Sequence, residues 1–338
     1  MVAETHREKK GSLASLEMSD FSKFAKPGMM KVLVTGATGF LGQMVSAELE
    51  KKHNVIRHGS REANLLVQKD TDAYFQMTYP EAVIHLAANV GGIGKNERLP
   101  GSLAYDNLMM GLNVLKACRD CRVRKVVVVG TICSYPKFTP VPFKEEDIWN
   151  GYPEETNAPY GIAKKALMVT GQAFRKEFGM NIVHLLMVNL YGPNDNFDLN
   201  DSHVIPAMIR KFHQAKENGN HAVALWGDGS PSREFLYVDD AAKAISLSLE
   251  KYDSSEPMNI GSGSEITIKA LAEKVQSVVG HRGEIVWEGS RPNGQPRRCL
   301  DVSRAEKALG WKASTSLDEG LAKTYRWWAE SEGKKCLS

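Results

Sequence analysis

The stretch KVLVTGATGFLG (residues 31–42) decides the fold of this chain. A β-branched apolar run ends in three glycines spaced G-x-x-G-x-x-G, and an amphipathic segment of helical character follows over residues 43–52. The first glycine of such a loop permits a tight turn, the second lets the backbone approach a pyrophosphate, and the third allows close helix packing. The pattern predicts a strand–turn–helix unit that binds a dinucleotide through Gly36, Ala37, Thr38, Gly39, Phe40, Leu41 and Gly42.

Further strand-like runs continue from this unit, and they alternate with helix-like segments. They cover residues 54–58, 82–87, 125–130 and 182–188. This alternation predicts an α/β fold with a Rossmann-type doubly wound parallel sheet. Beyond residue 194, loops rich in Gly, Pro and Asp separate shorter elements, which indicates a smaller C-terminal α/β substrate lobe.

The expected organisation therefore has four parts. Residues 1–29 are polar and charged and form a flexible N-terminal extension, and residues 331–338 form a tail. Residues 30–193 are mainly the nucleotide-binding domain. Residues 194–330 are mainly the substrate lobe, although some of their segments are expected to return to the first domain.

Composition excludes several classes of function. The 338 residues carry a net charge of +3 with no long basic run, which argues against nucleic-acid binding. The longest apolar runs have the length of strands, so no membrane span is expected. Five scattered cysteines indicate a reducing compartment, and we expect a cytoplasmic protein. The C-x-x-C at residues 118–121 has no second pair, so no metal site is predicted.

The residues after the second strand indicate which dinucleotide is preferred. Ser60 and Arg61 can hold a 2′-phosphate, whereas an acidic residue there would hold the 2′-hydroxyl of NAD. Glu62 follows directly, so a solvated Arg–Glu pair is the alternative. The basic and hydroxyl residues at this position favour NADP(H) over NAD as the cofactor. After the third strand, Ala87 should place a small side chain against the cofactor.

A Tyr and a Lys stand four residues apart at Tyr160 and Lys164, a spacing that puts both side chains on one helix face. An adjacent ammonium is expected to lower the pKa of the phenol, which would make it an effective acid. The alternative is an ordinary solvated helix face. Thr131 follows the strand at 125–130, where its hydroxyl can bind a substrate carbonyl. The three residues resemble the triad of the extended short-chain dehydrogenases.

Two more residues add a different chemistry. Cys133 lies two positions beyond Thr131 and should face the same crevice, although buried cysteines are often only small hydrophobic residues. His203 comes from the second lobe, and its alternative role is to cap the helix that follows. A thiol and an imidazole on opposite sides of a sugar ring can invert a carbon beside a ketone.

The chain resembles the GDP-L-fucose synthases over residues 31–330. The motifs are HLAANVGGI (85–93), CSYP (133–136), YGIAK (160–164), NLYGPNDNF (189–197), SHVIPA (202–207) and REFLYVDD (233–240). The resemblance implies a GDP-sugar substrate, an NADP(H) cofactor and a homodimer. It also implies epimerisation at C3 and C5 by Cys133 and His203, followed by reduction at C4 with Tyr160 as proton donor.

The resemblance assigns further contacts. It implies that Lys164, Asn189, Leu190 and His203 bind the cofactor. The residues that it implies for the substrate are Asn189, Lys211, Trp226, Arg233 and Arg291. A related reductase or epimerase for another nucleotide sugar, such as a GDP-heptose, would use the same groups. A non-catalytic dinucleotide-sensing protein is disfavoured because Tyr160, Lys164 and Cys133 are all present.

Overall fold

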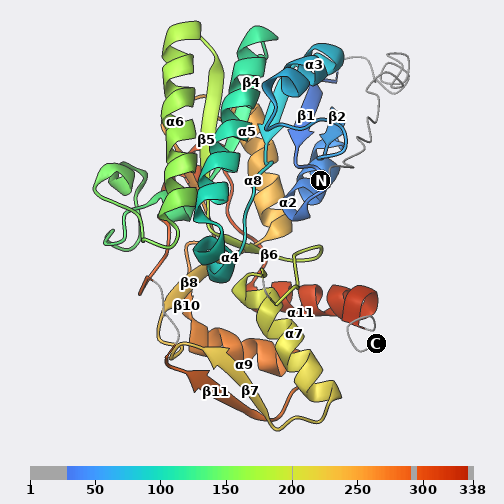
Figure 1. Cartoon of the computed structure of the whole chain (residues 1–338), viewed down its shortest axis with the longest axis vertical. Helices are drawn as coiled ribbons and strands as arrows, with labels where there is room; N and C mark the ends of the chain where they lie inside the picture. The colour runs from blue at the N-terminus through green and yellow to red at the C-terminus, as the bar shows by residue number, and fades with distance from the viewer. Residues whose placement is uncertain (1–28, 200, 291–294, 334–338) are drawn as a thin grey trace, which may run out of the picture.

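A six-stranded parallel sheet forms the centre of the larger lobe in the computed structural model, which describes residues 29–199, 201–290 and 295–333 (Figure 1). In spatial order its strands are β2 (Asn54–His58), β1 (Lys31–Thr35), β3 (Ala82–His85), β4 (Lys125–Thr131), β5 (Asn181–Met187) and β9 (Met258–Ile260). The predicted doubly wound parallel sheet is confirmed. Residues 1–28 of the expected extension and 334–338 of the expected tail lie outside the described residues.

Helices cover both faces of this sheet (Figure 1). On one face α3 (Gln68–Thr78), α5 (Pro100–Asp120) and α6 (Ala158–Phe178) pack against the central strands. On the other face lie α2 (Phe40–Leu49), α8 (Val238–Lys251) and α10 (Ser303–Leu309). Because both faces are covered, the inner strands are mostly apolar, and Val126 to Val128 of β4 are almost wholly buried. Along the chain, the short α4 (Ile93–Arg98) follows β3 and precedes α5.

The smaller lobe has its own core. Its strands are β6 (Asn189–Tyr191), β8 (Ser232–Tyr237) and β10 (Glu265–Thr267) in one sheet, and β7 (Ala222–Trp226) and β11 (Glu284–Glu288) in another. Its helices are α7 (Val204–Glu217), α9 (Ile268–Val279) and α11 (Leu317–Trp328). Phe212, Leu271 and Trp328 are wholly buried between them. The remaining elements are the short η2 (Ile132–Ser134), η3 (Glu145–Trp149) and η4 (Ala329–Gly333).

The chain crosses between the lobes several times. After residue 194 it builds the smaller lobe, yet α8, β9 and α10 pack on the large sheet. Two buried carboxylates hold these segments in place by accepting hydrogen bonds from backbone elsewhere in the chain. Glu234 of β8 accepts hydrogen bonds from the backbone N–H of Leu300 at 2.7 Å and of Gly263 at 2.6 Å. The division at residue 193 stays a prediction.

The second of these carboxylates is Asp240, at the start of α8. It accepts hydrogen bonds from the backbone N–H of Ser314 at 3.1 Å and of Thr315 at 2.7 Å, and from the Ser314 hydroxyl at 2.9 Å. Burial acts to raise the pKa of Asp240, but these hydrogen bonds outweigh it and hold that pKa below its usual range. The segment between α10 and α11 is thereby held against α8, which fixes how the smaller lobe approaches the sheet.

Candidate active site

The glycine loop lies between β1 and α2 and passes very close to the end of β3. Gly36 has φ +71°, and a Cβ placed there would lie 2.8 Å from the backbone nitrogen of Ala87. At Gly42 a Cβ would lie 2.0 Å from the carbonyl oxygen of Gly36. The Thr35 hydroxyl helps to hold the two segments together, because it accepts hydrogen bonds at 3.2 Å from the N–H groups of Leu86 and Ala87. The loop therefore requires glycines at these positions.

A cavity of about 850 Å³ lies at the carboxyl ends of the sheet strands, and residues of the smaller lobe line its other side. Ligands of doubly wound folds bind at this edge of the sheet. The predicted site residues that line it are Gly36, Thr38, Gly39, Phe40, Leu41, Gly42, Ala87, Thr131, Cys133, Tyr160, Lys164, Asn189, Leu190, His203, Lys211, Trp226 and Arg233. The fold thus brings together residues from 36 to 233 along the chain.

Two predicted cofactor residues are placed differently. Ala37 is buried in the core, and its N–H donates to the carbonyl of His58 at 2.9 Å, so it joins β1 to β2 rather than lining the cavity. Arg61 is exposed and is not among the lining residues, whereas Ser60 and Gly59 are. Glu62 accepts a hydrogen bond from the N–H of Gly59 at 2.7 Å, which shapes this turn. The phosphate contact of Arg61 stays a prediction.

The geometry fits a dinucleotide at the glycine loop. The close approaches at Gly36 and Gly42 leave no space for a side chain at either position, and both glycines line the cavity. Helix α2 begins here, and Gly39 at its N-cap carries no capping side chain. The first N–H groups of the helix are left available for a phosphate.

Tyr160 and Lys164 lie on the first turns of α6. The ammonium of Lys164 donates to the carbonyl of Val129 at 3.2 Å, and burial lowers the pKa of Lys164 to about 8. The pKa of Tyr160 is raised, first by burial and then by the neighbouring Cys133, while hydrogen bonding to Thr131 acts in the opposite direction. The predicted lowering of this pKa was wrong, because the ammonium bonds the β4 backbone and burial dominates. The phenol consequently keeps its proton at neutral pH and can act as a donor.

Strand β4 delivers Thr131 and Cys133 to the cavity through η2. The backbone N–H of Cys133 donates to the Thr131 hydroxyl at 3.1 Å, which fixes the turn. The Cys133 thiol is 3.6 Å from Oδ1 of Asn157 and accepts a contact from Nη1 of Arg298, also at 3.6 Å. A Cβ at Gly161 would lie 2.3 Å from the carbonyl of Cys133, so η2 sits directly on the first turn of α6.

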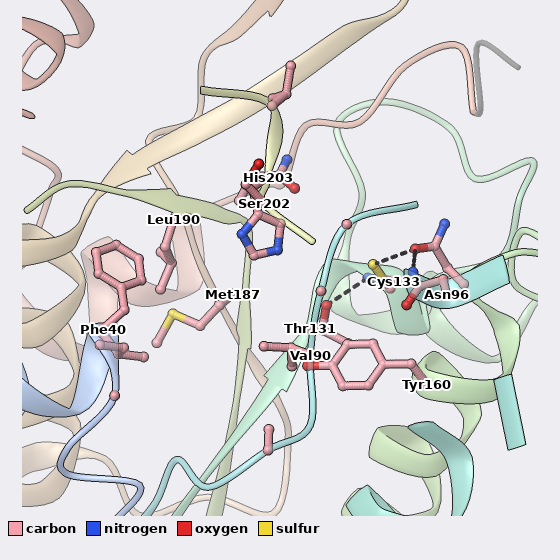
Figure 2. Close-up of a pocket in the computed structure, with 18 of the residues that line it drawn as sticks. Phe40, Val90, Asn96, Thr131, Cys133, Tyr160, Met187, Leu190, Ser202 and His203 are labelled. Carbon is pink, nitrogen blue, oxygen red and sulfur yellow. Dashed lines mark hydrogen bonds between the residues drawn. The ribbon is translucent and has the colours of Figure 1, made fainter. Parts of the chain in front are cut away.

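His203 enters the cavity from the smaller lobe. It is the N-cap residue of α7, yet its side chain makes no capping hydrogen bond, so the alternative of a capping histidine is not seen. In the view of Figure 2 the imidazole lies between Leu190 and Met187 on one side and Cys133 on the other. Its Nδ1 is 4.0 Å from Oδ1 of Asp195, whose side chain is only 4% exposed.

Three predicted substrate residues of the smaller lobe line the opposite wall. Trp226 is 50% exposed, so its ring offers a flat apolar surface to a ligand. Lys211 donates to the carbonyl of Ala224 at 2.9 Å, and burial lowers its pKa. Burial also lowers the pKa of Arg233 to about 10, with a further contribution from nearby Arg298. The predicted contact of Arg291 lies outside the described residues.

Sequence reasoning missed the polar groups around Cys133. Asn157 accepts a hydrogen bond from Asn96 at 3.0 Å and donates to Glu154. Asn157 stands three residues before Tyr160, so its position at the N-cap of α6 was a usable signal. Arg298 lies far along the chain with no motif around it, and only the fold brings it to the thiol.

The family is visible in the sequence as well as in this geometry. The model of the NAD dependent epimerase/dehydratase family matches residues 32–261. The chain belongs to this family. Probable GDP-L-fucose synthase 1 of Oryza sativa subsp. japonica is 42% identical over 89% of this chain and 92% of its own length. Members of this family thus include proteins named for the reaction that the resemblance implied.

Solved structures of the family show the same fold. A GDP-6-OMe-4-keto-L-xylo-heptose reductase from C. jejuni has a TM-score of 0.84 at 28% identity, covering 90% of this chain and 99% of that one. A GDP-L-fucose synthetase from Naegleria fowleri, bound to NADP, has a TM-score of 0.82 at 29% identity, covering 89% and 93%. No helix of the described residues is long and apolar enough to cross a membrane, and they contain no group of three or more His, Cys, Asp or Glu suited to a metal ion.

Proposed function

We propose that this chain is a bifunctional epimerase–reductase that converts GDP-4-keto-6-deoxy-D-mannose to GDP-L-fucose with NADPH. The observation that carries the proposal is the convergence of Cys133, His203 and Tyr160 on one cavity. A reductase alone needs a proton donor at the ketone oxygen. A thiol and an imidazole supplied by different lobes are suited to proton transfer at carbon, which epimerisation requires.

Epimerisation begins when Cys133, as thiolate, takes the proton from the carbon beside the C4 ketone. The electron pair of that C–H bond moves toward the ketone oxygen and gives an enolate. The Thr131 and Tyr160 hydroxyls stabilise the negative charge on that oxygen by hydrogen bonding. His203 then returns a proton to the opposite face of the same carbon, which inverts it. After each inversion the thiol releases its proton to solvent and the imidazole takes one up, so the same exchange can follow at the other carbon. Inversion at C3 and C5 gives the L-configured 4-keto sugar, and reduction at C4 then sets the L-galacto configuration.

Reduction uses the protonated phenol. Residues of the glycine loop, together with Ala87, Asn189 and Lys164, would hold NADPH, which supplies a hydride to C4 when bound. Tyr160 gives its proton to the C4 oxygen at the same time. Its raised pKa keeps the phenol protonated until negative charge develops on that oxygen. In this proposal Lys164, one turn further along α6, supplies the proton that restores the phenol.

The test supplies GDP-4-keto-6-deoxy-D-mannose and NADPH in D₂O and identifies the product. We expect NADPH oxidation, GDP-L-fucose, and deuterium at C3 and C5. Cys133→Ala should abolish deuterium incorporation, whereas Tyr160→Phe should retain it and block reduction. Cys121→Ala is the matched control, because this half-buried cysteine is not among the cavity-lining residues. No nicotinamide oxidation above background would sink the proposal.

A second candidate is a reductase or epimerase for a GDP-4-keto-heptose. The structural similarity to the C. jejuni heptose reductase favours it, with a TM-score of 0.84. The two candidates differ in the group carried at C6 of the sugar and not in the chemistry at C4. Competition between equal concentrations of the two 4-keto sugars, scored by product, decides between them. Preference for the heptose would replace the first candidate.

We also propose that two copies of the chain associate through α5 and α6. The two helices pack against each other at one side of the sheet (Figure 1). Several of their large apolar side chains are exposed. Tyr105 is 60% exposed, Val169 48% and Phe178 42%. Light scattering should give the mass of a dimer, and Val169→Glu should reduce it to that of one chain. A wild-type mass of one chain contradicts this proposal.

We propose a cytoplasmic location because the described cysteines form no disulfide bonds. The four that fall within the described residues are all free thiols, namely Cys118, Cys121, Cys133 and Cys299. Free thiols persist in a reducing compartment. Fractionation of cells that express the chain should recover it with cytosolic markers.

A further inference from the structure

Arg298 contacts the Cys133 sulfur directly with its guanidinium. Its Nη1 donates toward Sγ at 3.6 Å, a normal separation for a hydrogen bond to sulfur. The side chain is only 7% exposed, so little water screens this contact. Arg298 comes from the segment that follows β11, and no step of the mechanism above uses it.

The guanidinium is held in a fixed direction. Its Nε donates to Oε1 of Gln295 at 2.7 Å, and Nε2 of Gln295 donates to the carbonyl of Lys137 at 2.6 Å. The following residues are also tied down, since the N–H of Phe143 donates to the carbonyl of Cys299 at 2.8 Å. The segment that carries Arg298 is therefore bound at two points to the loop that follows η2, close to the thiol.

The other charged and titratable groups around the sulfur come from three directions. The phenol of Tyr160 faces it from α6, and the guanidinium of Arg233 faces it from β8. Glu154, just before α6, interacts electrostatically with both Arg233 and Arg298. Glu154 accepts hydrogen bonds from Thr156 and Asn157, so its charge is directed largely at those donors. The sulfur has hydrogen-bond contacts at 3.6 Å with both the amide oxygen of Asn157 and the guanidinium of Arg298, and of these two only the guanidinium is charged.

We propose that Arg298 is a positioning residue that activates Cys133, because its guanidinium stabilises the thiolate that abstracts the substrate proton. That Cys133 abstracts a substrate proton rests on the proposed function. The effect of Arg298 on the reactivity of the thiol does not, because it can be measured without substrate. An opposite charge at this distance favours the charged form of an acid, and cations beside a cysteine raise its nucleophilicity at neutral pH. The neutral thiol donates to the amide oxygen of Asn157 at 3.6 Å, and this hydrogen bond is lost when the proton leaves, so the guanidinium is the partner that the thiolate keeps.

The proposal also makes the reactivity of Cys133 depend on how the two lobes are packed together. Cys133 belongs to the large sheet, whereas Arg298 is carried by a segment that the chain reaches only after completing β11 of the smaller lobe. The thiol is therefore activated only when that segment is docked as the structure has it. Gln295, which orients the guanidinium, is 4% exposed and lines the same cavity.

The test measures how fast iodoacetamide alkylates Cys133 at pH 7 in the full chain, with peptide mass spectrometry to separate it from the other cysteines. Arg298→Gln should slow alkylation about tenfold, because the thiolate loses the cationic hydrogen-bond donor that stabilises it. Arg298→Lys should retain most of the rate. Arg297→Gln is the matched control, since this neighbouring arginine is exposed and pairs with Glu265.

Turnover adds a second readout. With substrate and NADPH, Arg298→Gln should lower kcat for deuterium incorporation with little change in KM. If alkylation keeps the wild-type rate and only KM rises, Arg298 anchors an anionic part of the substrate and the proposal is overturned. Gln295→Ala keeps the charge of Arg298 but removes the hydrogen bond that orients it, so an intermediate alkylation rate is expected. This second variant tests the proposal if Arg298→Gln fails to fold. Alkylation needs no substrate, so this test stands even where the proposed reaction fails.

Discussion

Gly36→Ala probes the closest approach of backbone to backbone in the cofactor site. A Cβ at this position would lie 2.8 Å from the nitrogen and 2.9 Å from the Cα of Ala87, and neither atom belongs to a side chain that could rotate away. The residue also has φ +71°. That conformation costs a non-glycine residue about 1–2 kcal/mol. Overpacking against fixed atoms adds about 1–3 kcal/mol.

Together these effects should lower the free energy of unfolding by about 2–5 kcal/mol. Relief of the contact requires the glycine loop to move away from the end of β3, and this loop is the surface expected to hold the pyrophosphate. NADPH should therefore bind at least about tenfold more weakly, which corresponds to about 1.4 kcal/mol. Urea unfolding measures the first effect, and calorimetric titration with NADPH measures the second.

Gly101→Ala is the control for this substitution. Gly101 lies in the first turn of α5, and nothing is within 4 Å of the position that a Cβ would take. Alanine there should be neutral or stabilise the chain by up to about 1 kcal/mol, because it favours helix. If Gly36→Ala unfolds at the wild-type urea concentration and binds NADPH normally, the close approach is not what the loop requires.

Three further outcomes are expected. Burial lowers the pKa of His85 to about 3 and of His184 to about 4, so below pH 6.5 the unfolded chain binds more protons than the folded chain. The free energy of unfolding should therefore fall as the pH drops, by about 2 kcal/mol for each histidine at pH 5. Urea midpoints that do not change between pH 7.5 and pH 5 contradict this. Asp240→Ala removes three hydrogen bonds and should cost about 3 kcal/mol in urea unfolding, whereas Asp318→Ala, at an exposed ion pair, should cost less than about 1 kcal/mol. Arg61→Ala should weaken NADPH about tenfold in calorimetry and leave NADH unchanged; equal losses for both would remove the 2′-phosphate contact.

The sheet and its loop were predictable because their signals are local. The apolar run at residues 30–35 was expected as a strand, and residues 31–35 of it form β1, while the run at 54–58 forms β2 at the bounds expected. The helix after the glycines begins at Phe40 rather than at residue 43, because the second and third glycines stand at its N-cap and inside its first turn. Periodicity and glycine spacing carry this information without knowledge of distant contacts.

The electrostatics of the site were not predictable in the same way. Helical spacing places Tyr160 and Lys164 on one face, but it cannot reveal that the ammonium bonds the carbonyl of Val129 or that burial raises the pKa of the phenol. Both effects depend on how deeply α6 packs against β4. Ala37 was expected at the cofactor because it lies between two loop glycines, yet its backbone pairs with β2.

By itself the sequence determined the α/β fold, the dinucleotide loop, and the residue types that acid–base chemistry at a keto sugar requires. These follow from patterns within a few residues of each other, where chain geometry alone sets the spacing. Only the tertiary structure decided that Cys133 and His203 share one cavity, and that Arg298 reaches the thiol from more than a hundred residues away. Such contacts depend on how the lobes dock, and docking is settled by packing and buried hydrogen bonds across the whole molecule.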